Sequence, residues 1–112
     1  FYNAIGEADV IVMSFAEHNG TYTSAYKNLF DWTSRIDMKV FQNKPVLMLS
    51  TSPGQGGAQS VLASAQASAP YFSATVIGAL SLPSFFENFD LEQGIVTNQQ
   101  FNRDLLGTLS KI

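Results

Sequence analysis

The chain has 112 residues, of which 46% are hydrophobic and 13% are charged, and its formal net charge is −3. These values predict one globular domain with a buried core and argue against a disordered segment. The basic residues are scattered singly, which argues against a nucleic-acid-binding surface. Cysteine is absent, so disulfides, thiolate metal sites and a cysteine nucleophile are excluded.

The sequence also contains no apolar run of the roughly 20 residues that cross a bilayer. No charged segment followed by an apolar one marks a signal peptide, so we expect a soluble, cytoplasmic protein with no membrane contact. His18 is the single histidine, and a multi-histidine metal site is therefore not expected.

The first half of the chain predicts a strand, a polar turn and a helix. Residues 1–7 look like the last turn of a helix with Gly6 as its C-cap, and the β-branched apolar run at 9–15 predicts a strand buried on both faces. A polar turn at 14–22 leads into a helix over 24–35, with Thr23 or Ser24 as N-cap. We expect this helix to face the core with Tyr26, Leu29, Phe30 and either Trp32 or Ile36.

The second half repeats this order. Residues 45–50 predict another buried strand, the glycine-rich turn at 51–57 follows, and a helix is expected over 58–68. Residues 74–82 predict a third strand, and 84–97 a loop whose phenylalanines belong to the core or a dimer interface. A last helix is expected from the N-cap Asn98 to Ile112, with an apolar face of Phe101, Leu105, Leu106 and Leu109.

This β-α-β-α-β-α order predicts the α/β class, with a parallel sheet, right-handed crossovers and helices on both faces. The two polar turns follow the carboxyl ends of buried parallel strands, where such sheets bind ligands. Three strands are few for this architecture. We therefore expect residues 1–112 to be a single domain that is an N-terminally truncated fragment of a larger one.

Three motifs, in this order, resemble those of the NADPH-dependent FMN reductase family of flavodoxin-like proteins, whose relatives reduce quinones, azo dyes and chromate. That family has a turn P-E-Y-N-G-S, a helix with L-K-N-x-x-D-W and a turn S-x-G-x-x-G-G. This chain has A-E-H-N-G-T at 16–21, Y-K-N-L-F-D-W at 26–32 and S-P-G-Q-G-G at 52–57. The closing stretch at 86–96 is also similar to the family's end.

The resemblance implies a three-layer α/β/α fold with strand order 2-1-3-4-5, of which this chain would hold about strands 3–5. It implies FMN as cofactor, NAD(P)H as hydride donor and a quinone, flavin or azo compound as acceptor, in a homo-oligomer. The family's phosphate-binding turn after its first strand has no counterpart here. The strand at 9–15 would then be an open edge, which we expect another chain segment or another copy to cover.

The family's flavin contacts can be carried over residue by residue. The first-turn residues would contact the isoalloxazine ring partly through backbone groups, and the glycines of the second turn would let the backbone approach the ring. Two positions depart from the family pattern: Ala16 replaces its proline and His18 its tyrosine. No catalytic acid or base and no metal ligand is expected. The cofactor-binding residues implied are Ala16, Glu17, His18, Asn19, Gly20, Ser52, Pro53, Gly54, Gly56 and Gly57.

Other interpretations remain open at this point. The chain could be a flavodoxin-like electron carrier without turnover, or a fragment that binds no FMN without the phosphate turn. His18 could be an ordinary exposed loop residue, and Lys27 with Asp31 a surface ion pair. A hydrolase with Ser52 as nucleophile is disfavoured, because the G-x-S-x-G elbow is absent.

Overall fold

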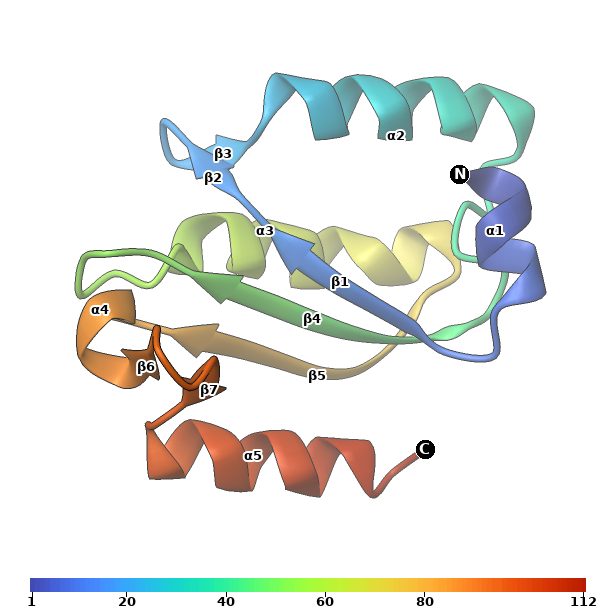
Figure 1. Ribbon diagram of the computed structural model, residues 1–112. Coiled ribbons are helices and arrows are strands. Elements are labelled where there is room, and N and C mark those ends of the chain that lie inside the picture. The colour runs from blue at the N-terminus through green and yellow to red at the C-terminus, as the bar shows by residue number, and fades with distance from the viewer.

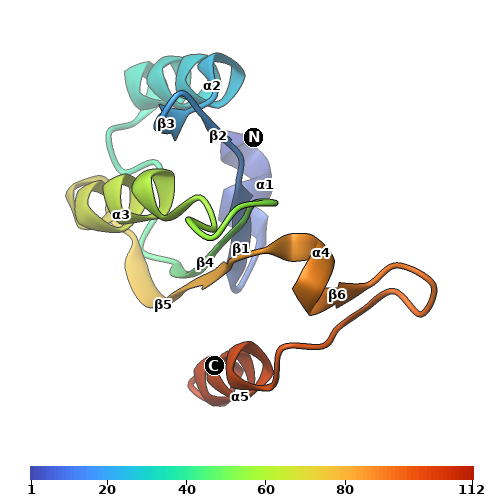
Figure 2. The ribbon, with the colours of Figure 1, turned by 90° about the vertical axis from the view of Figure 1, so that its left-hand side faces the viewer.

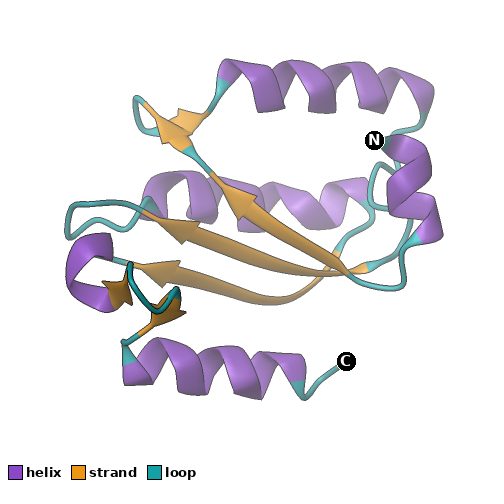
Figure 3. Ribbon diagram, in the orientation of Figure 1, coloured by secondary structure: helices purple, strands orange, loops and turns teal.

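The computed structural model describes residues 1–112 and is a layered α/β structure (Figure 1). Its central sheet contains β1 (Ile11–Phe15), β4 (Pro45–Thr51) and β5 (Thr75–Leu82), all parallel and in the order β1-β4-β5. Helices α2 (Ser24–Ile36) and α3 (Gln59–Ser68) lie on one face and α5 (Gln99–Leu109) on the other (Figures 2 and 3). The predicted α/β class and parallel sheet are therefore confirmed.

The remaining elements are short. Helix α1 (Tyr2–Glu7) precedes β1, and a small hairpin of β2 (Glu17–His18) and β3 (Thr21–Tyr22) follows it. The 3-10 turn η1 (Ala69–Phe72) extends α3. The expected loop at 84–97 is wrong in detail, since it contains α4 (Phe85–Asn88) and a second hairpin of β6 (Phe89–Asp90) and β7 (Ile95–Val96).

The core lies between the sheet and α3. Central strand β4 contributes Val46 and Met48, which are almost fully buried, and α3 packs Val61 and Ala65 against them. Helix α2 is joined to this core through aromatic rings. Tyr26 packs edge-on against Phe15 with ring centroids 5.3 Å apart, and Phe30 against Phe72 at 4.8 Å.

The predicted N-caps of α2 and α5 are confirmed. Thr23 Oγ1 accepts a hydrogen bond from the Tyr26 amide at 3.1 Å, and Asn98 Oδ1 accepts one from the Phe101 amide at 2.8 Å. Each side chain satisfies a first-turn N–H that has no partner within its helix. Helix α5 ends at Leu109 rather than at the predicted Ile112.

Gly6 is not the C-cap of α1, because it lies inside that helix and Ala8 follows as the cap. The position lies close to another residue: a Cβ there would be 2.8 Å from the side-chain oxygen of Gln42, which would have to shift. Gln42 uses its amide nitrogen to donate to the Tyr2 carbonyl at 2.9 Å. The glycine therefore marks a close approach between α1 and the residues before β4.

Strand β1 is not buried on both faces, as its apolar run predicted. It begins at Ile11, Val12 is 59% exposed and Ser14 is also exposed, whereas Phe15 is buried. The reason is coverage. Helix α5 packs on β5, and the Thr108 methyl would lie 2.6 Å from a Cβ built at Gly78. The helix therefore covers the β5 side of its sheet face and leaves the β1 side of the same face open.

Two expected apolar faces are also only partly buried. Trp32 and Ile36 are 68% and 72% exposed, because Tyr26, Phe30 and Thr33 form the inward stripe of α2 and the other two fall on its flank. Leu29 lies on the same flank. On α5, Phe101 and Leu105 are partly buried, while Leu106 and Leu109 are exposed.

Candidate functional site

The two predicted turns lie at the same edge of the sheet. The first follows β1 and the second, residues 52–58, follows β4, and both strands end on the same side because they are parallel (Figure 1). The sequence motifs 36 residues apart are therefore neighbours in the fold, at the carboxyl edge where parallel α/β sheets bind ligands.

The first turn is a tight hairpin. Glu17 pairs with Tyr22 and His18 with Thr21, and the two connecting residues, Asn19 and Gly20, have φ of 55° and 83°. Asn-Gly is the preferred pair for such a two-residue connection, because both positions need positive φ. This turn chemistry is why residues 17–22 leave the sheet before α2 begins.

The side chain of Glu17 extends from the first turn to α3, the helix that follows the second turn. Its Oε1 accepts a hydrogen bond from the Val61 amide at 2.7 Å, in the first turn of α3. The neighbouring His18, Asn19 and Gly20 are exposed. His18 and Asn19 line a shallow open groove together with Tyr22 and Lys27.

The second turn is fixed from inside through its carbonyl groups. The Gly57 carbonyl accepts hydrogen bonds from the hydroxyls of Ser50 at 2.8 Å and Ser81 at 2.7 Å. The Gly54 carbonyl accepts from the Ser84 amide at 2.8 Å and from the Ser52 hydroxyl at 3.2 Å. These bonds attach the turn to β4, to β5 and to the segment that follows β5.

The glycines of this turn differ from one another. Gly57 has φ of 60° and is buried, and a Cβ there would overlap Ser81 Oγ and lie 3.1 Å from Pro83 Cα. Gly54 and Gly56 are exposed, and no atom lies within 4 Å of a Cβ built at either position. Gly57 is thus needed by the protein's own packing, whereas Gly54 and Gly56 border open space.

The amide groups of the open part of the turn have no acceptor. The N–H groups of Gly54, Gln55 and Gly56 donate no hydrogen bond within the chain. Backbone donors beside open space, next to a polar hairpin, match the acceptor atoms along the edge of an isoalloxazine ring. None of the six basic residues belongs to either turn, so these residues fit a flavin ring but offer no basic side chain to a flavin phosphate.

The structure therefore brings the predicted site residues to one edge. Ala16, His18, Asn19, Gly20, Pro53, Gly54 and Gly56 are exposed there, Ser52 and Glu17 are partly buried, and Gly57 is buried. Ser52 Oγ donates to its own turn and makes no bond to His18, so no nucleophile–base pair is present. No group of three or more His, Cys, Asp or Glu side chains could hold a metal ion.

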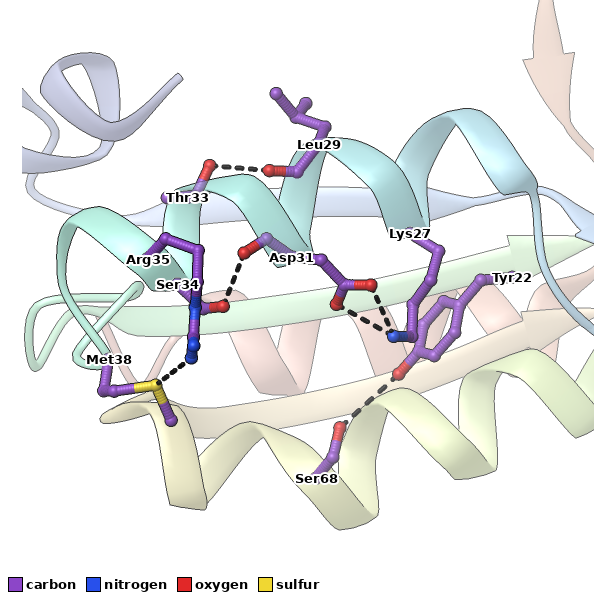
Figure 4. A network of polar contacts seen from close by, with 9 residues as sticks. All are labelled: Tyr22, Lys27, Leu29, Asp31, Thr33, Ser34, Arg35, Met38 and Ser68. Atoms are coloured by element: carbon purple, nitrogen blue, oxygen red, sulfur yellow. Dashed lines mark hydrogen bonds and ion pairs between the residues drawn. The ribbon is translucent and has the colours of Figure 1, made fainter.

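A cavity that the sequence did not predict lies between α2 and α3. It has a volume of about 260 Å³, and at its rim the Lys27 ammonium pairs with the Asp31 carboxylate at 2.8 Å (Figure 4). Tyr26 lines it and donates to Met13 Sδ at 3.5 Å, and burial raises the pKa of this phenol well above its usual value. Its lining is mainly hydrophobic and includes six aromatic side chains: Phe15, Tyr22, Tyr26, Phe30, Phe41 and Phe72.

The cavity lies beneath α2, away from the unpartnered amides of the second turn. The spacing of residues 22, 26 and 30 could have indicated an aromatic layer, but not the space left beneath it.

Both ends of the Lys27–Asp31 pair are more than half exposed, as the prediction of a surface ion pair required. No helix of the chain has the length and apolar character needed to cross a bilayer.

Comparison with known proteins agrees with this geometry. The family model described as NADPH-dependent FMN reductase matches residues 1–87. The match ends at Glu87, so the similarity of residues 86–96 to the family's end stays a prediction. The chain is also similar to an NADPH:quinone oxidoreductase of Arabidopsis thaliana, with 38% identity over 60 residues.

That alignment covers 54% of this chain and 30% of the Arabidopsis protein, so the chain spans under a third of the relative that it matches. The family model covers most of the chain, including the first turn, α2 and the second turn. The resemblance seen in the three motifs is therefore confirmed, and the α/β structure is that of a flavodoxin-like fold. The chain belongs to the NADPH-dependent FMN reductase family.

Proposed function

We propose that this chain forms the ring-binding side of an FMN site in an NAD(P)H-dependent reductase. The observation that carries the proposal is the pairing of two turns at one sheet edge, where Gly54, Gln55 and Gly56 have amides without acceptors. Membership of the NADPH-dependent FMN reductase family supports the choice of cofactor. The similarity to a quinone oxidoreductase supports a quinone acceptor, with a free flavin or azo compound as related choices.

The residues of this chain would bind and orient the flavin rather than react. The second-turn amides would donate to acceptor atoms on the ring edge, and the exposed Asn19 amide could match an edge that carries both donors and acceptors. When bound, FMN would supply hydride chemistry between NAD(P)H and the acceptor. Neither turn contains a nucleophile–base pair, so we assign no general acid or base here.

The remainder of the site would come from another part of the polypeptide or from another copy. Neither turn carries a basic side chain for the phosphate, and the free edge of β1 offers a row of unpaired backbone groups. We propose that a further strand or a second copy covers this edge, in a homo-oligomer of the cytoplasm. A monomer in solution with that strand exposed would contradict this part.

Turnover of the full-length protein tests the function. NADH or NADPH oxidation should require FMN and should speed up when a quinone is added. Bound flavin without turnover would favour the electron-carrier alternative. Failure to bind FMN at all would overturn the proposal.

A matched pair of variants links the activity to the second turn. Gly56→Ala places a methyl group where the ring is proposed to approach. Gly107→Ala adds the same methyl to open space on α5. We expect the first substitution to lower FMN affinity and the second to leave it unchanged, and equal effects would show that the turn does not face the flavin.

A further inference from the structure

Helix α3 begins without a cap of its own. Its N-cap position is Ala58, which has φ of 57° and offers no side-chain acceptor to the first-turn amides. Such amides need an acceptor from elsewhere in the structure. The Val61 amide finds one in Glu17 Oε1 at 2.7 Å, although Glu17 lies 44 residues earlier in the sequence.

This bond joins the two turns of the proposed FMN site. Glu17 lies in β2, between Ala16 and His18, so its backbone is part of the first turn. Val61 lies in the first turn of α3, which continues directly from the glycine-rich second turn. A carboxylate at a helix N-terminus also interacts favourably with the helix dipole, which strengthens the contact.

The second turn is anchored on its other side by a separate set of bonds. The hydroxyls of Ser50 and Ser81 hold the Gly57 carbonyl from within the sheet. Those bonds fix the second turn to β4 and β5 but do not reach the first turn. Glu17 adds a bond from the first turn to the start of α3, whereas the contact of the Tyr22 hydroxyl with Ser68 Oγ at 3.4 Å lies at the far end of that helix.

We propose that Glu17 is a positioning residue, which sets the spacing of the two turns by capping α3 and does not act as a charged contact to the flavin. This inference rests on the proposed function, because it concerns the same site. Its chemical basis is the hydrogen bond to Val61, which occupies the Oε1 acceptor. The main requirement at position 17 is then an acceptor oxygen of the right reach, to which the negative charge adds only its interaction with the helix dipole.

Two substitutions separate these roles. Glu17→Gln keeps an acceptor oxygen at the same reach, whereas Glu17→Ala removes it. We expect Glu17→Ala to weaken FMN binding about five- to tenfold, in line with the loss of one cap, and Glu17→Gln to restore most of the affinity. The reduction potential of bound flavin should be nearly the same in wild type and Glu17→Gln.

A control is available at another helix. Asn98→Ala removes the cap of α5, a bond of 2.8 Å that is similar in kind but does not connect the two turns. It should lower the unfolding free energy by an amount comparable to Glu17→Ala and leave FMN affinity unchanged. Equal losses of FMN affinity in the two variants would reduce Glu17 to a general stabilising residue and overturn the proposal.

Hydrogen exchange at the Val61 amide tests the cap without any cofactor. It should be slow in wild type, somewhat faster in Glu17→Gln and fast in Glu17→Ala. If the wild-type protein fails to bind FMN, the proposed function is refuted, while this measurement still decides whether the cap exists. If Glu17→Gln loses as much FMN affinity as Glu17→Ala and shifts the flavin potential, Glu17 is a charged flavin contact and the positioning role is wrong.

Discussion

Replacement of Gly57 by alanine should strongly destabilise the protein, because the space for the new methyl group is already filled. Residue 57 has φ of 60°, a left-handed conformation that costs an L-residue about 1–2 kcal/mol. The methyl would also overlap Ser81 Oγ, forcing that hydroxyl to give up its 2.7 Å bond to the Gly57 carbonyl. Losing such a bond costs about 1 kcal/mol.

The backbone beside Gly57 cannot easily yield to relieve the overlap. Pro83 Cα and N would lie 3.1 and 3.2 Å from the new methyl. The residues that follow are bonded to the second turn, Ser84 to the Gly54 carbonyl at 2.8 Å and Phe85 to the Ser52 carbonyl at 2.9 Å. We therefore expect a total loss of about 2–4 kcal/mol, a large part of the roughly 5–15 kcal/mol that stabilises a typical domain.

Equilibrium urea unfolding followed by far-ultraviolet circular dichroism measures this loss. Gly54→Ala is the matched control, because its φ is not left-handed and no atom lies within 4 Å of its Cβ. Its unfolding free energy should stay within about 0.5 kcal/mol of wild type. The double variant with Ser81→Ala should recover part of the loss caused by Gly57→Ala. If Gly57→Ala is as stable as Gly54→Ala, the packing argument is refuted.

Two further changes test α2. Thr23→Ala should lower the unfolding free energy by about 1 kcal/mol, because the Tyr26 amide loses its acceptor. Tyr26→Phe should change the pH dependence of stability: burial raises the pKa of the phenol in the folded state, so its contribution is complete below the unfolded pKa and is lost as pH rises above it. Urea unfolding at about pH 8 and 11, on either side of the usual tyrosine pKa of about 10, should show a smaller loss for Tyr26→Phe than for wild type. An unchanged unfolding free energy in Thr23→Ala would contradict the capping role of Thr23. Equal losses of stability with pH in wild type and Tyr26→Phe would contradict the raised pKa of Tyr26.

Local features of the fold were predictable because they depend on short stretches of sequence. The caps Thr23 and Asn98 have the right side chain immediately before an amphipathic segment, and the strands at β4 and β5 are continuous apolar runs. The Asn19-Gly20 pair is a recognised hairpin signal, and the hairpin of β2 and β3 forms at the predicted polar turn.

Several errors concern burial, which depends on neighbours far away in the sequence. Nothing in residues 9–15 indicates that α5 would pack on β5 and leave Val12 exposed. Trp32 and Ile36 have helical spacing suitable for a core, but so do Tyr26, Phe30 and Thr33, and the aromatic contacts to the sheet decide between them. No element of this chain covers the exposed side of β1 or the exposed flank of α2.

The sequence located the two turns but not the contacts that hold them together. Motif spacing located both turns, yet three different roles among their residues needed the structure. Gly57 satisfies internal packing, Gly54 and Gly56 border open space, and Glu17 caps α3. The roles of Gly57 and Glu17 depend on Ser81, Pro83 and Val61, and the open space beside Gly54 and Gly56 depends on the whole fold, which local sequence does not indicate.

The affinity of the full-length protein for FMN, measured by quenching of flavin fluorescence, tests the central claim most directly. We expect wild type to bind FMN, and Gly54→Ala to bind at least about tenfold more weakly, equivalent to about 1.4 kcal/mol, with its unfolding free energy unchanged. Gly107→Ala, which also adds a methyl to open space, should bind as wild type does. No binding by wild type, or equal binding by wild type and both variants, would contradict a flavin ring held against the second turn.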